Sequence, residues 1–200
     1  KKHPNLKTVN DVMASPQHVG AQFNNCPDGW GCRIVNDNLV KALKLEGSGI
    51  KVFNHGSGET LSTSIASAYE DKKPWFGYYW GPTAVLGKYK MKKLSIGPID
   101  AKVHSGNQNK GTANPGVSDF PPAPVLTVVT SAFKKREPAI AKLMSKVSFD
   151  VEVMNGLLAW KKDKGASAEE AAVRFLNTQK STWTNWVNDG AHKKLSAIIK

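Results

Sequence analysis

The sequence predicts an α/β fold for its first part, followed by a mainly helical tail. Two patterns carry this prediction. The first is a helical stripe, a glycine stop and a short strand that follow one another within the first 94 residues. The second is the β-prone run Val125–Val129, after which the sequence shows helical signals only. Hydrophobic residues make up 40% of the 200-residue chain and charged residues 22%, which is typical of a globular protein with a real core.

Helices and strands alternate in the first part of the chain. A first helix is expected where four aliphatic residues share one face: Leu39, Val40, Leu43 and Leu45. The glycines of residues 47–49 should end it, because glycine favours chain reversal over helix continuation. Residues 50–53 then fit a short strand. The segment 56–58 opens a second helix, and Pro74 forces the chain out of it.

The segment Trp75–Trp80 is dense in aromatic residues, which suits a β-strand. Side chains alternate between the two faces of a strand with a period of two. Tyr78 and Trp80 are therefore predicted to share one face.

A domain boundary is expected within residues 95–124, which are rich in Gly, Pro and Asn and too long for an ordinary connector. Residues 1–94 would form one domain, and residues 125–200 would form a second part. The run Val125–Val129 should be a strand buried on both faces. Pro138 fits the first turn of the helix that follows it.

The tail carries several helix start and stop signals. Asp150 can cap one helix, and Gly165 can end it. Residues 167–170 have the form of a capping box that starts the next helix. Trp183 and Trp186 are three residues apart, which suits a further helix. No internal repeat is visible.

The formal charge of +12 would suit a nucleic-acid partner, because clustered Lys and Arg displace counterions from phosphate. The lysines are instead spread in small groups, with no nucleic-acid recognition signature around them. We therefore expect a solvated basic surface and no nucleic-acid partner. No apolar run approaches the roughly 18 residues of a transmembrane helix. Residues 1–4 contain neither an initiating Met nor an apolar targeting segment, so a processed or excised piece is expected.

No catalytic constellation is visible. The five histidines are scattered, and none has a second metal ligand at a suitable spacing. Ser57 lies between two glycines but lacks the Gly-x-Ser-x-Gly form of a nucleophile turn. Helix capping is its expected role. We therefore expect no enzyme activity, no metal and no cofactor.

Cys26 and Cys32 are the only cysteines, and five residues separate them. A disulfide between them is geometrically reasonable and would imply an oxidising compartment outside the cytoplasm. A ring this small would stabilise the protein by roughly 2 kcal/mol, so its main effect would be to restrict the shape of the loop. A metal site and a redox pair remain alternatives, although each would prefer other spacings or further ligands.

The loop between the cysteines has features of a ligand site. Its end, Gly31 and Cys32, leads into a helix, and the first amides of a helix bind carboxylates well. Trp30 is held between glycines in the same loop, where an exposed indole face would suit a cation. The combination matches a ligand that carries a methylated ammonium and a carboxylate a few ångströms apart.

Three segments resemble the glycine betaine and proline betaine substrate-binding proteins of ABC transporters. They are Asn25–Cys32, Lys73–Thr83 and the region from Val125 to the end. The resemblance implies that Trp30 and Trp80 are walls of an aromatic cage around the ammonium.

The same resemblance implies that the amides of Gly31 and Cys32 bind the carboxylate. Tyr78 is a further candidate, for which ordinary packing is an equal alternative. The other tryptophans are better explained by packing: Trp75, Trp160, Trp183 and Trp186.

The resemblance also implies a fold like that of type II periplasmic binding proteins, a periplasmic or otherwise extracytoplasmic location, and a membrane permease as partner. The expected ligand is a small quaternary-ammonium zwitterion. Alternatives are another solute, such as choline, carnitine, ectoine or an amino acid, and an adhesion or structural domain. A choline site would want an acid near the hydroxyl group, and Asp28 is the one acid in the loop.

One departure from the family pattern concerns its two lobes. The chain begins where the second lobe begins, so residues 1–94 would be one complete α/β lobe. Residues 95–124 would cross over, and residues 125–200 would be the returning portion of the first lobe without its partner strands. A further cage tryptophan of the family then has no counterpart here. We expect this chain alone to bind betaine weakly.

Overall fold

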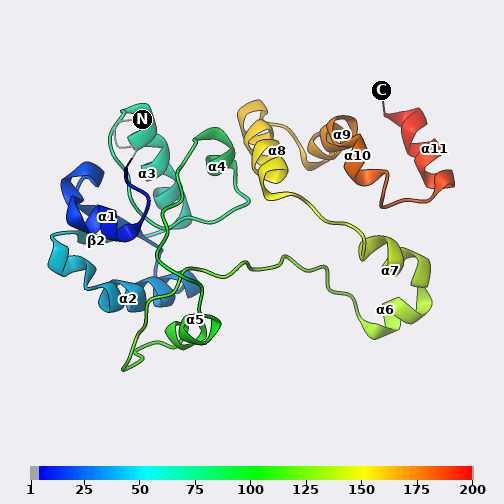
Figure 1. The fold of residues 1–200 in the computed structure, drawn as a ribbon. Coiled ribbons are helices and arrows are strands. Elements are labelled where there is room, and N and C mark those ends of the chain that lie inside the picture. The colour runs from blue at the N-terminus through cyan, green and yellow to red at the C-terminus, as the bar shows by residue number, and fades with distance from the viewer. Residues whose placement is uncertain (1–4, 200) are drawn as a thin grey trace. The chain divides into compact units, whose positions relative to one another are not determined.

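The computed structural model describes residues 5–199, which divide into two compact units (Figure 1). Within this range, unit 1 comprises residues 5–80 and 89–122, and unit 2 comprises residues 81–88 and 123–199. Each unit therefore consists of two separate stretches of the chain.

The units differ from the expected domain ranges. Residues 95–122 belong to unit 1, and residues 81–88 belong to unit 2. The assignment of residues 1–94 and 125–200 to lobes of a binding protein stays a prediction, because the units reflect packing within this chain alone. Residues 1–4, on which the expectation of a processed piece rests, lie outside the described range.

Unit 1 contains two short strands surrounded by helices (Figure 1). Its elements are α1 (Val9–Ala14), η1 (Pro16–Val19), β1 (Gln22–Asn25), α2 (Gly31–Leu43), η2 (Leu45–Ser48), β2 (Lys51–Asn54), α3 (Gly58–Glu70) and α5 (Ala101–Asn107). The strands β1 and β2 are parallel, with Gln22 opposite Lys51 and Asn25 opposite Asn54. Parallel pairing requires a crossover, which α2 supplies. The carboxyl ends of both strands therefore lie beside the loop that precedes α2.

The core of unit 1 follows the predicted apolar faces. One cluster of buried residues combines α1, η1, η2 and the segments next to β2 and Gly77: Val9, Val12, Val19, Leu45, Ile50 and Phe76. The helix α3 begins as predicted, with Ser57 as its capping residue, and it buries Leu61 and Ile65. The helix α2 ends at Leu43, before the predicted glycines, because Lys44 adopts the left-handed conformation with φ of 53°.

The predicted strand Trp75–Trp80 forms only an isolated bridge. Gly77 pairs with Asn24, through the hydrogen bonds from Asn24 N to Phe76 O (2.9 Å) and from Tyr78 N to Asn24 O (3.1 Å). β1 ends at the next residue and the chain turns into the loop. The segment after Tyr78 thus has no neighbouring strand among the described residues, so its aromatic content alone does not make it a strand.

Helices are the only regular elements among the described residues of unit 2. Its elements are α4 (Ala84–Lys88), α6 (Ser131–Arg136), α7 (Pro138–Met144), α8 (Val151–Lys164), α9 (Ala168–Thr178), α10 (Lys180–Trp183) and α11 (Asp189–Ile198). The predicted signals are confirmed: Pro138 starts α7, Asp150 caps α8, and Gly165 ends it with φ of 61°. Ser167 and Glu170 form the capping box of α9. Trp183 ends α10, whereas Trp186 lies beyond it.

The helices α4 and α8 of unit 2 meet at a very close contact. A Cβ atom at Gly87 would lie 2.0 Å from the backbone oxygen of Asn155, so only glycine fits there. The buried Asn155 side chain accepts a hydrogen bond from the amide of Thr83 (2.6 Å). This contact joins the short segment 81–88 to the rest of unit 2.

The prediction of a buried strand at Val125–Val129 is wrong. This run has no regular structure, and Val125, Leu126 and Val128 are 92%, 74% and 86% exposed. A strand needs a neighbour to satisfy its backbone hydrogen bonds and to cover its side chains. Within residues 5–199, no segment pairs with this run. No helix in the same range is both long and apolar enough to cross a membrane.

Candidate functional site

The predicted disulfide is present and closes the loop before α2. Cys26 and Cys32 are bonded, with their Cα atoms 6.2 Å apart. Gly29 has φ of 82°, a conformation that favours glycine over other residues. The loop is therefore covalently closed, and its sulfur atoms are engaged with each other rather than with a metal. Among the described residues, no group of three metal-binding side chains is gathered anywhere.

The loop leads directly into α2, as predicted. Trp30 is the N-cap residue in an extended conformation, and its side chain makes no capping hydrogen bond. Gly31 and Cys32 occupy the first turn, where helical amides have no partner within the helix. This end of a 13-residue helix carries partial positive charge. The position suits the predicted carboxylate contact.

Trp30 and Trp80 lie together. Their ring centroids are 5.2 Å apart, the planes meet at 71°, and Trp30 is 37% exposed. The Trp30 ring also lies against the start of α3, since a Cβ atom at Gly58 would be 2.8 Å from its Cη2 atom. The two indoles predicted from separate motifs thus form one aromatic surface beside the first turn of α2.

The neighbouring tyrosines have different surroundings. Tyr78 packs against Phe120, with ring centroids 5.0 Å apart, and burial raises the pKa of its hydroxyl group. This contact supports the packing explanation for Tyr78. Tyr79 instead stacks on Trp80, with ring centroids 4.5 Å apart and an angle of 26° between the ring planes. Burial raises the pKa of Tyr79, a hydrogen bond with Ser62 lowers it, and the charge of Glu59 raises it.

The contact of Tyr79 with Trp80 was not predicted from the sequence. Strand alternation placed it on the face opposite Trp80, and the segment is not a strand. Its position next to Trp80 in the sequence was the available signal.

A buried asparagine network lies under the loop. Asn25 is fully buried, and its Oδ1 accepts hydrogen bonds from the amide of Cys26 (2.8 Å) and from Asn36 Nδ2 (2.8 Å). Its Nδ2 donates to Asp37 Oδ1 (2.9 Å) and Asn54 Oδ1 (3.1 Å). The network ties the loop to both strands and to α2. Nothing in the sequence pattern distinguished these asparagines from ordinary turn residues.

Arg33 forms a second closure of the loop. Its Nη1 lies 2.8 Å from Asp28 Oδ1 and 3.5 Å from the carbonyl oxygen of Cys26. Its Nε donates to both carboxylate oxygens of Asp37, at 2.9 and 3.0 Å. The one acid of the loop, proposed from sequence as a partner for choline, is therefore already paired with an arginine.

His55 is a buried titratable group at the carboxyl end of β2. Its Nε2 lies 3.1 Å from Asn24 Oδ1, and its ring meets the edge of Phe53. The Asn24 amide donates to the carbonyl oxygen of Phe76 (2.9 Å), which leaves Oδ1 as an acceptor for the histidine N–H. Burial lowers the pKa of His55, so the neutral ring is favoured.

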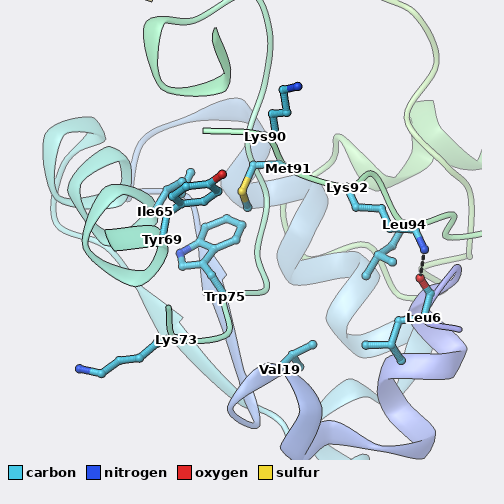
Figure 2. A pocket seen from close by; sticks show the side chains of 10 residues that line it. All are labelled: Leu6, Val19, Ile65, Tyr69, Lys73, Trp75, Lys90, Met91, Lys92 and Leu94. Atoms are coloured by element: carbon cyan, nitrogen blue, oxygen red, sulfur yellow. Dashed lines mark hydrogen bonds between the residues drawn. The ribbon is translucent and has the colours of Figure 1, made fainter. Parts of the chain in front are cut away.

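A hollow in unit 1 has a volume of about 260 Å³ and contains none of the predicted site residues (Figure 2). Its lining is Leu6, Val19, Ile65, Tyr69, Lys73, Trp75, Lys90, Met91, Lys92 and Leu94. Figure 2 shows the ends of Lys73 and Lys90 directed away from the hollow, while Lys92 Nζ donates to the carbonyl oxygen of Leu6. Ligand sites usually combine apolar walls with a few convergent polar groups, and such groups do not converge here.

The four tryptophans assigned to packing make packing contacts. The indole N–H of Trp75 donates to Ser64 Oγ (3.0 Å), and that of Trp183 to the carbonyl oxygen of Leu176 (2.7 Å). Trp186 stacks on Phe175, with ring centroids 5.7 Å apart. The guanidinium of Arg174 lies 4.6 Å from the ring centroid of Trp160.

The profile of one protein family matches residues 1–178, and this family is described as the substrate binding domain of ABC-type glycine betaine transport systems, OpuAC. The chain belongs to this family. Among curated members, the glycine betaine/proline betaine-binding periplasmic protein of Escherichia coli (strain K12) is 25% identical over 175 residues. The match covers 84% of this chain and 52% of the relative, so the chain spans about half of that protein's length.

Several solved structures share the fold. Lactococcal OpuAC, closed and complexed with glycine betaine, superposes with a TM-score of 0.59 at 17% identity, covering 94% of this chain and 64% of that one. The glycine betaine/L-proline-binding protein ProX of Borrelia burgdorferi superposes with a TM-score of 0.59 at 14% identity, and the match covers 97% of this chain and 65% of ProX. An ABC-transporter choline binding protein in complex with choline superposes with a TM-score of 0.56 at 16% identity, and the match covers 100% of this chain and 66% of that one. These are type II periplasmic binding proteins, and the predicted fold is thereby confirmed.

Proposed function

We propose that the chain belongs to the solute-binding component of an ABC importer and binds a quaternary-ammonium zwitterion, glycine betaine or proline betaine. In this proposal Trp30 and Trp80 hold the ammonium, and the amides of Gly31 and Cys32 hold the carboxylate. The observation that carries it is the pairing of two indoles, 5.2 Å apart, at the positive end of α2. Family membership supports the same ligand class.

The chemistry of the two contacts is complementary. A methylated ammonium has no hydrogen-bond donor to satisfy, so an aromatic face binds it well. A carboxylate gains hydrogen bonds from free helical amides and favourable interaction with the helix dipole. A betaine satisfies both surfaces at once, whereas choline lacks the carboxylate, an amino acid lacks the methylated ammonium, and carnitine carries the two groups farther apart. Those solutes form the alternative proposal.

The same proposal places the protein in the periplasm or another extracytoplasmic space, with a membrane permease as its partner. The disulfide between Cys26 and Cys32 supports an oxidising location. Binding rather than catalysis is the proposed activity.

The affinity of this chain is expected to be low. One desolvated cation–π contact contributes about 2 kcal/mol, which corresponds to about 30-fold in the dissociation constant. A site with two aromatic walls should therefore bind about 30-fold more weakly than one with three, which shifts a micromolar dissociation constant toward the millimolar range.

The test is a titration of the ¹⁵N-labelled chain with glycine betaine, proline betaine and choline, followed by the indole N–H signals of its six tryptophans. The signals of Trp30 and Trp80 should shift with a millimolar dissociation constant for the betaines. The indole N–H of Trp183 is buried in unit 2 and donates a hydrogen bond to the carbonyl oxygen of Leu176, so its signal should not shift.

Two variants complete the test. Trp30→Ala and Trp80→Ala should each raise the dissociation constant for glycine betaine by about 30-fold. Trp160→Phe, which alters the contact with Arg174 in unit 2, serves as the matched control and should bind like the unaltered chain. Betaine binding that leaves both site indoles unshifted would refute the proposal.

A further inference from the structure

We infer that Arg33 determines the charge selectivity of the loop by holding the carboxylate of Asp28, so that the site prefers zwitterions to simple cations. This inference rests on the proposed function. It assigns a positioning and selectivity role to a residue that neither the motifs nor the family membership singled out.

The first step is geometric. Arg33 is largely buried, with only 16% of its side chain exposed, although arginines at helix surfaces are usually solvated. Its Nε donates hydrogen bonds to both carboxylate oxygens of Asp37, and Asp37 in turn accepts a hydrogen bond from the buried Asn25. Asp37 and Asn25 therefore fix the position of the guanidinium, and its Nη1 lies 2.8 Å from Asp28 in the loop.

The second step concerns Asp28. Its side chain is 92% exposed, and its ion pair with Arg33 Nη1 (2.8 Å) is its one charged contact among the described residues. Asp28 lies two residues before Trp30, inside the ring closed by the disulfide. Asp28 thus belongs to the same closed loop as Trp30, Gly31 and Cys32, the residues proposed to contact the ligand.

The third step is electrostatic. An unpaired Asp28 would attract any quaternary ammonium and repel the carboxylate that α2 binds through Gly31 and Cys32. Choline would gain from the attraction alone, whereas a betaine would feel both effects. Arg33 offsets the charge of Asp28 and so makes the potential next to the first turn of α2 less negative. The arrangement favours the ligand with a carboxylate over the ligand without one.

The fourth step concerns the choice of arginine. The Nε of the planar guanidinium donates to both oxygens of Asp37, while its Nη1 reaches Asp28 and the Cys26 carbonyl oxygen. A lysine ammonium is a single point charge and cannot span these partners at once. Arg33→Lys therefore keeps the positive charge but loses the simultaneous contacts with Asp28 and Asp37. The variant separates the contribution of the charge from that of the geometry.

The experiment measures dissociation constants for glycine betaine and choline by the same indole titration, in about 20 mM and about 500 mM salt. In low salt, Arg33→Gln should lower the ratio of the choline constant to the betaine constant about fivefold, and in high salt by less than about twofold. The double variant Asp28→Asn/Arg33→Gln should return the ratio to near its original value. Arg33→Lys should keep most of it.

Lys41→Gln is the matched control, because it removes one positive charge from the exposed last turn of the same helix. It should leave the ratio unchanged. If Arg33→Gln weakens both ligands equally at both salt concentrations, Arg33 only supports the loop and the selectivity role is refuted. If the unaltered chain binds neither ligand at its indoles, the proposed function fails first, so the two failures are distinguishable.

Discussion

The two compact units differ in the kinds of interaction that hold them together. In unit 1, a disulfide, the Arg33–Asp28 ion pair and a buried asparagine network all hold one loop of seven residues, Cys26–Cys32. In unit 2, the helices meet mainly through apolar side chains and a close backbone contact at Gly87, with the Thr83–Asn155 hydrogen bond and the Lys88–Asp163 ion pair beside it. Covalent and polar cross-links are thus concentrated where the proposed ligand contacts lie.

This difference has a physical reason. A loop that presents Trp30 and the first amides of α2 gains affinity when its shape is preorganised, because less conformational entropy is lost on binding. Helix packing in unit 2 supports no such loop, and the run Val125–Val129 shows how little local order a segment has without partners. The predictions below test the contrast, beginning with the largest expected effect.

The first prediction concerns the close contact in unit 2. Gly87→Ala should lower the free energy of unfolding of unit 2 by about 3 kcal/mol, because the added Cβ meets backbone atoms of Asn155 and α4 must move away. Denaturant unfolding followed at the Trp183 indole signal measures unit 2, and the Trp75 signal measures unit 1. Only the Trp183 transition should shift.

Gly156→Ala is the control for this prediction. It adds the same methyl group in α8, one residue from Asn155, where no atom lies within 4 Å of the new Cβ. Removing a glycine from a helix interior should stabilise unit 2 by up to about 1 kcal/mol. Equal effects of the two substitutions would mean that the contact at Gly87 does not hold unit 2 together.

The second prediction concerns the disulfide in unit 1. The variant Cys26→Ser/Cys32→Ser should lower the free energy of unfolding of unit 1 by about 2 kcal/mol, since a short ring restricts the unfolded chain only modestly. Unit 2 should be unaffected. The Trp75 transition in denaturant checks the first statement and the Trp183 transition the second.

A reducing agent provides the control for the second prediction. It should destabilise the unaltered chain by the same amount and leave the double variant unchanged, because the described residues include no other cysteine. A loss that also appears in the Trp183 transition would show that the loop supports both units, against the contrast drawn above.

Much of the fold could be predicted because its signals are local. Asp150, Gly165 and Ser167 mark helix ends through hydrogen bonds to residues at most a few positions away, and each prediction is confirmed. The run Val125–Val129 was misjudged because β-propensity describes how a side chain fits a sheet, not whether a neighbouring strand exists. The segment Trp75–Trp80 was misjudged for the same reason, since its pairing stops where β1 stops.

The candidate site divides in the same way. Trp30, Gly31 and Cys32 could be proposed because a disulfide-closed loop that enters a helix is a local pattern, and Trp80 was proposed from the resemblance to the family. Arg33 was missed, although it lies in the next position, because its role depends on the fold placing Asp28 and Asp37 on two sides of one guanidinium. Asn25 was missed because burial, not its type, makes its hydrogen bonds important.

The third prediction, with the smallest expected effect, concerns pH and again separates the units. Burial lowers the pKa of His55 in unit 1 below its ordinary value. Between that lowered pKa and the ordinary value of about 6.5, the unfolded chain binds a proton that the folded chain does not. The contribution of His55 to stability is therefore fully present above about pH 6.5 and declines as the pH falls through that value.

Urea unfolding at about pH 7 and about pH 5 measures this decline, since carboxylates such as Asp11 and Glu59 have lowered pKa values and titrate below this window. The Trp75 transition should fall to lower urea at the lower pH, and His55→Gln should remove most of that shift while keeping a donor for Asn24. His192→Gln, at an exposed histidine of unit 2, should leave it in place. If His55→Gln leaves the shift unchanged, the buried histidine does not couple the stability of unit 1 to pH, and another group near the strands must do so.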